Sequence, residues 1–332
     1  MRDKKGTSAA DRLPQFLKSP IFTSTGRTSQ DLLFEKVHGL VGDASVEKFG
    51  LSDGDWSKLA NEVNIIINSA ASVRFDDPMK KALAINVLPT ITCLKLARQA
   101  KDLAAYVHVS TTYAYSQLPV TEERVHPIVI HPDLLLKKAN LLDDGTLDEQ
   151  CKKLYFEGRP NSYLFTKSVA ENYLLEHAQG LPVAIGRLSM ITVTRYEPEP
   201  GFIDVLQAAN VLAFVGAIGA LRVFNYDPSI YVHGMAVDTA ANSLLAIGYL
   251  TATKYRQSDM RVYNITQAYV EAQIVQKICT DVFHEYPSST AFRTPADLSG
   301  RPSKLWYTYN RWISEWLFVF VIDKILICFG FN

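Results

Sequence analysis

Apolar and polar positions between about residues 35 and 190 form short strand-like runs separated by longer helix-like segments. The pattern predicts strands at about 36–41, 63–67, 105–109 and 182–188. The run at 63–67 is continuous rather than alternating, which is typical of a strand buried on both faces. This alternation of strands and helices predicts the α/β class, with a doubly wound parallel sheet and helices on both faces.

Three longer segments join the predicted strands. A helix is expected over about 78–100, kinked or restarted at Pro89. An amphipathic helix is expected over 162–179, closed by Gly180. Residues 117–160 form a long excursion with some helix, and beyond residue 190 the pattern loosens into an apolar, glycine-containing stretch at 201–224.

Composition excludes some classes of function. The 332 residues are 48% hydrophobic and 20% charged, as in an ordinary globular protein, and they suffice for one large domain or one and a half. Because the net charge is zero, nothing in the charge balance favours nucleic-acid binding. The four cysteines are far apart and lack metal-ligand spacing, so reduced thiols are expected.

The segment 306–329 is rich in aromatic and aliphatic residues but is interrupted by Glu315, Asp323 and Lys324. Its longest uncharged stretch is much shorter than the ~20 residues that a membrane-spanning helix needs. Two interpretations remain open: a helix buried in a core, or an interfacial or membrane-embedded hairpin.

The candidate chemistry centres on Tyr163 and Lys167, which lie four residues apart and therefore on one face of the predicted helix. An ammonium there favours the phenolate form, and a hydroxyl from Ser110 or Thr111, at the end of the 105–109 strand, could orient the same oxygen. Such a set can transfer a proton to a substrate oxygen. A Tyr-x-x-x-Lys match is common by chance, so its value depends on the elements around it.

The carboxyl end of the 63–67 strand carries the small residues Asn68-Ser69-Ala70-Ala71. Ligands of open α/β sheets bind at such ends, where small side chains allow close approach to the backbone. A dinucleotide-binding unit should also contain a strand followed by a G-x-x-G-x-x-G turn, and no such turn precedes Gly42. The sheet is therefore expected to lack its usual first unit.

Several segments together resemble the fatty acyl-CoA reductases of the extended short-chain dehydrogenase type, also called the male-sterility family. They are Val41-Gly42-Asp43, the run 63–75 ending in Ala71-Ser72-Val73-Arg74-Phe75, the strand end 107–111, Arg159-Pro160-Asn161-Ser162-Tyr163 with Lys167, and Val237-Asp238. The resemblance covers most of residues 10–270.

The resemblance implies an NAD(P)-binding, Rossmann-like reductase domain at 1–270, incomplete at its N-terminus, and a partial, mainly helical C-terminal domain at 271–332. The implied reaction is NADPH-dependent reduction of a long-chain fatty acyl-CoA to a fatty alcohol. The family also implies association of 306–329 with a cytosol-facing membrane, of the peroxisome or the endoplasmic reticulum.

By the same resemblance, Tyr163 is the general acid, and Lys167 lowers its pKa and hydrogen-bonds the nicotinamide ribose. Thr111 or Ser110 holds the carbonyl oxygen, with loop length favouring Thr111. Purely structural interpretations remain open for four features. Asp43 is then a turn residue, Asn86 a structural asparagine and His108 a core histidine. The segment 201–224 is then ordinary core packing instead of the wall of an acyl tunnel. The residues implied as cofactor contacts are Asp43, Ala70, Ala71, Asn86, Lys167 and Arg187.

Two other functions stay open at this stage. One is an extended dehydrogenase or epimerase that acts on a sugar nucleotide or sterol; the other is an inactive fragment that no longer binds cofactor. The missing glycine turn would remove two or three charge-assisted hydrogen bonds, each worth roughly 1.5–3 kcal/mol, so weak NADPH binding and an inactive chain are expected. The missing first strand would leave a sheet edge unpaired, so aggregation is expected as well.

Overall fold

The computed structural model describes residues 7–23, 30–206, 209–221, 223, 225–256, 259–267, 269–291, 304–317 and 320. The chain divides into two compact units, and its path alternates between them. The first unit contains Met1–Ser189, Arg195–Pro200 and Asp238–Ile265; the second contains Met190–Thr194, Gly201–Val237 and Thr266–Asn332. This division differs from the boundary expected at residue 270, because 190–194 and 201–237 belong to the second unit.

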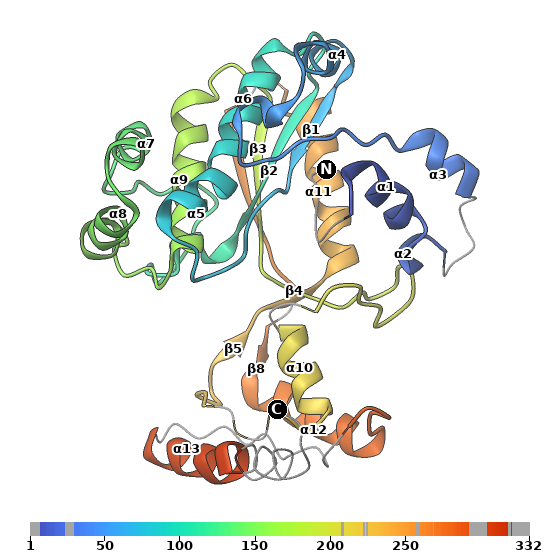
Figure 1. Ribbon diagram of the computed structural model, residues 1–332, viewed down its shortest axis with the longest axis vertical. Coiled ribbons are helices and arrows are strands. Elements are labelled where there is room, and N and C mark those ends of the chain that lie inside the picture. Colours follow the sequence, from blue (N-terminus) through green and yellow to red (C-terminus); the bar gives the residue numbers. More distant parts are fainter. Residues whose placement is uncertain are drawn as a thin grey trace. The chain divides into compact units, whose positions relative to one another are not determined.

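The first unit is built on a parallel sheet (Figure 1). Its strands, in spatial order, are β1 (Ile65–Asn68), β2 (Ala105–Thr111), β3 (Val183–Leu188) and β7 (Arg261–Ile265), and all neighbours pair in parallel. The expected α/β class and three of the four expected strands are confirmed. In the register, Asn68 pairs with His108 and Ser110 pairs with Arg187, so the carboxyl ends of β1, β2 and β3 lie at one edge.

One face of the sheet is covered by a helical layer (Figure 1). Its core contains Trp56 of α4 (Asp53–Glu62), Leu94 of α6 (Leu88–Gln99) and Leu174 of α9 (Ser162–His177), packed on Tyr106 and Ile185. A second apolar cluster packs α9 against α5 (Met79–Asn86) and against the helices formed by residues 117–160. Those helices are α7 (Pro132–Leu141), α8 (Asp144–Gln150) and the π-helical turn η3 (Cys151–Tyr155).

The opposite face of the sheet is covered by α11 (Val237–Thr253) (Figure 1). Leu244 and Ile247 of this helix pack against Val107 of β2 and Ala184 of β3. A methyl group added at Gly186 would come within 2.8 Å of the Leu244 side chain, so the glycine allows the close approach. Helices on both faces, as the sequence predicts, are thus confirmed.

The elements of the first unit that precede β1 are helical in the part of the chain that the structure describes. They include α1 (Ala9–Leu17), α2 (Pro20–Thr23), α3 (Gln30–Lys36) and the short 3-10 turn η1 (Glu47–Gly50). The strand expected at 36–41 is wrong: the chain from 37 to 43 is irregular, and Gly39 lies against Leu13 of α1. An apolar run forms a strand only beside another strand that can share its backbone hydrogen bonds.

Two other expectations need correction. β1 is not buried on both faces, since the exposed fractions of Ile65 and Ile67 are 51% and 42% while Ile66 and Asn68 are buried. The helix over 162–179 is not amphipathic, because every residue from Leu164 to Asn172 is buried. By contrast, the predicted restart at Pro89 is confirmed: α5 ends at Asn86, and Pro89 lies in the first turn of α6.

Asp238, at the start of α11, ties the short segment Arg195–Pro200 to the first unit. Its carboxylate accepts the backbone N–H groups of Arg195 at 3.0 Å, Tyr196 at 2.7 Å and Glu197 at 3.1 Å. Desolvation raises the pKa of Asp238, but these backbone hydrogen bonds outweigh it and bring the pKa to about 2.

The second unit combines helices with two small sheets. β4 (Met190–Thr192) pairs in parallel with β6 (Gly234–Ala236), and β5 (Tyr231–Val232) pairs antiparallel with β8 (Val270–Glu271). Its helices are α10 (Ala209–Ala217), α12 (Ala272–Glu285), α13 (Lys304–Arg311) and the π-helical turn η4 (Trp312–Trp316). Across the described residues, every helix is too short or too polar to cross a membrane.

Candidate active site

Tyr163 and Lys167 both project from the first two turns of α9. The helix begins after Asn161, whose side-chain oxygen accepts the backbone N–H of Leu164 at 3.0 Å and so caps the helix. Pro160, the residue before Asn161, has no backbone N–H and so cannot donate a hydrogen bond to the segment that precedes the helix. Tyr163 therefore lies at the start of the helix, and Lys167 lies one turn further on.

Tyr163 is partly buried and lies beside Thr111, the last residue of β2. Its ring packs against Phe75, with 6.0 Å between ring centroids. Burial raises the pKa of Tyr163 to about 12, and a hydrogen bond with the Thr111 side chain opposes this rise. The sequence predicts that Lys167 lowers this pKa; in the structure the pKa is raised, because desolvation of the phenolate outweighs the opposing effect of Thr111.

The Lys167 ammonium is buried and anchored to β2. Its Nζ donates to the carbonyl oxygen of Val109 at 2.9 Å. Burial lowers the pKa of Lys167 to about 8, although the nearby Glu171 carboxylate raises it. The amine therefore titrates close to neutral pH, which is useful for a group that takes part in proton transfer.

The structure separates the two hydroxyls at the end of β2. The Thr111 side chain lies close enough to Tyr163 to oppose the rise in its pKa, and its oxygen accepts the backbone N–H of Tyr113 at 3.3 Å. Ser110 instead donates to Glu171 Oε1 at 2.6 Å, deep in the interior. Thr111 thus lies beside the proposed acid and Ser110 does not, which agrees with the preference for Thr111 from loop length.

Asn86 is buried, and its two hydrogen-bond partners lie in separate segments. Its Oδ1 accepts the backbone N–H of Ser72 at 2.8 Å, and its Nδ2 donates to Thr166 Oγ1 at 2.9 Å. It therefore holds the chain that follows β1 against α9, next to Lys167. These contacts favour the structural interpretation of Asn86 over a direct cofactor contact.

The cofactor contacts expected near β1 lie in different surroundings. Ala70 and Ala71 are exposed and follow the carboxyl end of β1, at the same edge as Thr111. Asp43 lies in a turn, where its Oδ1 accepts both the N–H of Ser45 at 2.8 Å and the hydroxyl of Ser45 at 2.7 Å. The alternative interpretation of Asp43 as a turn residue fits this geometry.

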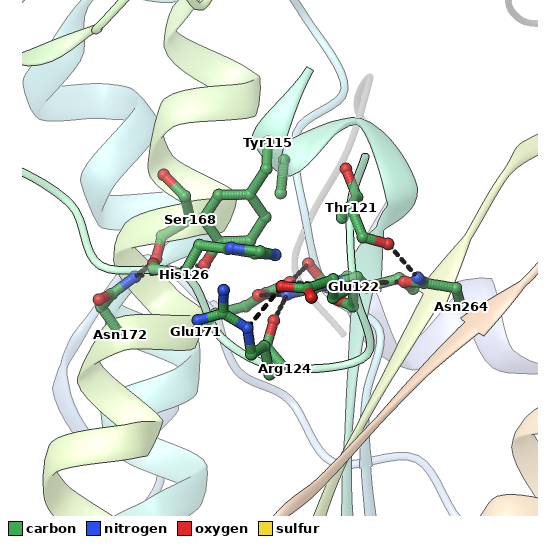
Figure 2. A network of polar contacts seen from close by, with 12 residues as sticks. Tyr115, Thr121, Glu122, Arg124, His126, Ser168, Glu171, Asn172 and Asn264 are labelled. Atoms are coloured by element: carbon green, nitrogen blue, oxygen red, sulfur yellow. Dashed lines mark hydrogen bonds and ion pairs between the residues drawn. The ribbon is translucent and has the colours of Figure 1, made fainter. Parts of the chain in front are cut away.

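Arg187 lies where a cofactor contact is not expected. Its side chain is fully buried, and its Nη2 pairs with Glu171 Oε2 at 2.6 Å. Nη1 of the same guanidinium donates to the carbonyl oxygen of Glu122 at 2.9 Å, and Nη2 also donates to that of Arg124 at 2.8 Å. Figure 2 labels Glu122 and Arg124. These contacts make Arg187 an internal anchor instead of a ligand-binding side chain.

Two further side chains, His108 and Glu171, lie near Lys167. His108 is buried beside Asn68, and its pKa is held well below the usual value, first by burial and then by Lys167, so the ring is neutral. Glu171 was missed in the sequence, although it follows Lys167 by four residues and Tyr163 by eight, on the same helix face. Within the described residues, His, Cys, Asp and Glu side chains form no metal-binding group of three or more.

The carboxyl end of β2 thus brings together the phenol of Tyr163, the hydroxyl of Thr111 and, one helical turn away, the buried amine of Lys167. A phenol with a raised pKa is a proton donor at neutral pH, and the hydroxyl can hold the oxygen that receives the proton. This set suits proton delivery to a carbonyl oxygen.

Comparisons with known proteins agree with this chemistry. A model of an NAD-binding family described as male sterility protein matches residues 1–244. Fatty acyl-CoA reductase 2 of Homo sapiens is 31% identical over 298 residues, which are 89% of this chain and 57% of that protein. Fatty acyl-CoA reductase wat of Drosophila melanogaster is 34% identical over 257 residues, which are 77% of this chain and 49% of that protein. The chain therefore spans about half the length of these relatives.

Solved structures support the fold. The reductase domain of a non-ribosomal peptide synthetase from Mycobacterium tuberculosis aligns with a TM-score of 0.61 at 17% identity, over 95% of this chain and 68% of that one. A thiolation-reductase di-domain from an archaeal non-ribosomal peptide synthetase aligns with a TM-score of 0.58 at 22% identity, over 85% and 53% of the two chains. Because the family match extends over 1–244 and the fold agrees with it, this chain belongs to the male sterility family of fatty acyl-CoA reductases.

Proposed function

We propose that this chain carries the reductase centre of an enzyme that reduces a long-chain fatty acyl-CoA to a fatty alcohol with NADPH. The observation that carries the proposal is the grouping of Tyr163 with Thr111 at the end of β2, while the Lys167 ammonium, one turn along α9, donates to Val109. The names of the relatives support the substrate class, and the NAD-binding family supports a nicotinamide cofactor.

The described residues fit the nicotinamide end of such a cofactor. Ala70 and Ala71 are exposed at the end of β1 and have side chains no larger than a methyl group. An ammonium has three N–H donors, and Val109 accepts one from Lys167, so this side chain can also hold a ribose hydroxyl. When bound, the cofactor supplies hydride; the protein supplies the proton and the oxygen contacts.

Thioester reduction to an alcohol passes through two stages, and each consumes one hydride and one proton. In the first stage the thioester yields an aldehyde and free CoA, and in the second the aldehyde yields the alcohol. In both stages Tyr163 donates its proton to the carbonyl oxygen, while Thr111 hydrogen-bonds the same oxygen. Each such hydrogen bond to a developing oxyanion is worth about 3 kcal/mol.

An acyl chain needs a continuous apolar surface, and α10 supports the proposal that 201–224 supplies part of one. Val211, Leu212 and Phe214 of this helix are all exposed despite being apolar. Residues 207, 208, 222 and 224 of the segment lie outside the described residues. Their exposure favours an apolar binding surface over ordinary core packing.

We also propose that the C-terminal region binds a membrane surface, cytosol-facing, at the peroxisome or endoplasmic reticulum. Along α13 and η4, Leu305, Tyr309, Trp312 and Trp316 are exposed at helical spacing. Aromatic side chains at such spacing suit a bilayer interface. Residues 321–332 lie outside the described residues, and the choice of organelle rests on the resemblance alone.

Vesicle flotation tests the membrane proposal. We expect the chain to float with anionic phospholipid vesicles, and Trp312→Ser/Trp316→Ser to reduce the bound fraction roughly fivefold, because the two indoles lose their interfacial contacts. Leu141→Ser, an exposed apolar residue of α7, serves as the control and should float as the parent does. Equal flotation of the double variant and the parent would contradict the proposal.

The reductase proposal is tested by substitution of the proton donor. With palmitoyl-CoA and NADPH, Tyr163→Phe should lower turnover by about 10²–10⁴-fold, because the ring still packs on Phe75 but no longer donates a proton. Tyr173→Phe, on the same helix, is the matched control and should keep the parent rate. Turnover of Tyr163→Phe within roughly threefold of the parent excludes Tyr163 as the acid, and calorimetry with NADPH and NADH measures the cofactor preference separately.

A further inference from the structure

Two buried opposite charges lie behind the proposed proton donor. Glu171 and Arg187 both have fully buried side chains and form a two-pronged pair, with Nη2 to Oε2 at 2.6 Å and Nε to Oε1 at 3.0 Å. Desolvation acts against a charged Arg187, but hydrogen bonding and the charge of Glu171 raise its pKa overall. A buried pair costs desolvation energy, so its stability value alone is weak. Its position relative to the proposed site is more informative.

The pair connects the strand and the helix that carry the proposed site. Ser110 and Arg187 are direct partners in the β2–β3 register, and both hydrogen-bond Glu171. Ser110 immediately precedes Thr111, and Glu171 follows Lys167 by one helical turn. A single carboxylate therefore fixes α9 against the end of β2, at the level where Thr111 meets Tyr163.

The guanidinium extends the same network to the loop after β2. It donates to the carbonyl oxygens of Glu122 and Arg124, and it lies over the ring of Tyr115, with 4.8 Å to the centroid. Asn264 of β7 holds the same loop through Thr121, to which its Nδ2 donates at 2.7 Å. Figure 2 labels Tyr115, Glu122, Glu171 and Asn264 within this network of polar contacts.

We propose that the Glu171–Arg187 pair is the positioning unit of the reductase site, holding Lys167 and Thr111 in register and supplying the negative charge that balances the Lys167 ammonium. This inference rests on the proposed function for its catalytic meaning, but the charge balance can be measured without substrate or cofactor. It assigns Ser110 to the same unit, as the hydroxyl that orients the Glu171 carboxylate.

The groups around Lys167 make the charge balance testable. Tyr163 and Glu171 lie one turn before and after it on α9, His108 faces it from β2, and Arg187 lies beyond Glu171 on β3. Glu171, which forms the ion pair with Arg187, is the carboxylate of this set, while His108 and Tyr163 are neutral at pH 7. If Glu171 becomes neutral, Arg187 is left as an uncompensated cation, and both changes lower the pKa of Lys167.

The experiment measures the titration of Lys167 directly, by the chemical shift of its ¹³Cε atom in lysine-labelled protein, with the signal assigned through Lys167→Met. In Glu171→Gln the midpoint should fall by about one pH unit or more relative to the parent. The matched control is Glu122→Gln, which removes the exposed ion pair with Arg124 in the neighbouring loop and should leave the midpoint unchanged. A folded Glu171→Gln variant with an unchanged midpoint overturns the proposal.

A second variant covers the case in which Glu171→Gln does not fold. Glu171→Asp keeps the charge but withdraws it by one methylene, and the midpoint should then fall by about 0.3 of a pH unit. An unchanged midpoint in that variant overturns the proposal equally. If the midpoints shift as expected while Tyr163→Phe has normal turnover, the charge balance stands and the reductase assignment fails, so the two failures are distinguishable.

Discussion

β1 and β2 are neighbouring strands with similar apolar sequences, yet they occupy different environments. Val107 of β2 is fully buried between α11 and the rest of the core, whereas Ile65 and Ile67 of β1 are about half exposed. β1 is the terminal strand of the described sheet, and only its Ile66 and Asn68 face is covered. The difference shows that coverage by helices, and not the hydrophobicity of the strand, decides what each position contributes.

The largest expected effect is the difference in stability between an aspartate introduced at Val107 and one introduced at Ile67. Val107→Asp places a charge in a site without solvent or a partner and should destabilise the first unit by more than about 4 kcal/mol, enough to prevent folding. Ile67→Asp on the open face of β1 should cost about 1 kcal/mol or less. Urea unfolding monitored by circular dichroism measures both, and equal losses would show that β1 is covered in solution.

The buried ammonium of Lys167 gives a pH-dependent contrast. Its pKa of about 8 lies below the ordinary 10.5, so the unfolded chain binds more protons between these values, and stability should rise with pH across that window. The difference corresponds to roughly 3 kcal/mol at pH 7, less about 1 kcal/mol for the bond to Val109. Lys167→Met should therefore stabilise the chain at pH 7 by about 2 kcal/mol.

The gain from Lys167→Met should vanish by about pH 11, where the parent lysine is neutral in both states. Lys95→Met provides the control, because Lys95 is exposed and paired with Glu47 on the surface of α6. Its effect should be small, and the same within error at both pH values. A pH-independent gain in Lys167→Met would mean that the pKa of Lys167 is the same in the folded and unfolded chain, so that burial does not lower it.

The smallest expected effect concerns solubility. Ile65→Lys/Ile67→Lys should lower self-association of the chain while changing its free energy of unfolding by about 0.5 kcal/mol or less, because charged side chains discourage pairing at a strand edge. Light scattering against protein concentration measures the association. Val120→Lys, which is exposed but outside any strand, controls for the added charge. If both variants reduce scattering equally, the β1 edge is not the association surface.

Much of the fold was predictable because local pattern and tertiary environment agree. The strands β2 and β3, and the break between α5 and α6 near Pro89, follow from apolar periodicity and from the geometry of proline. The strand expected at 36–41 and the double burial of β1 were wrong, since a run of apolar residues does not state which neighbours will cover it.

The candidate site was predictable only in part. Tyr163, Lys167 and Thr111 follow from their spacing on two elements and from the family resemblance. Glu171 and Arg187 were not identified as a pair, because their contact depends on the β2–β3 register and on the rotation of α9, and neither can be read from residue order. Ser110 and Thr111 are adjacent and chemically alike, and only the structure shows that their hydroxyls have different partners.

The alternating path of the chain between its two units bears on how the protein can be divided. β5 and β8 of the second unit come from residues 231–232 and 270–271, so a truncation after residue 270 removes Glu271 and leaves Tyr231 without its strand partner. Likewise, excising 190–237 as one block would take Arg195–Pro200 away from the Asp238 carboxylate that binds its backbone. The second unit thus consists of an inserted segment and a later segment whose strands pair with each other, and neither segment can be exchanged between homologues as an autonomous module.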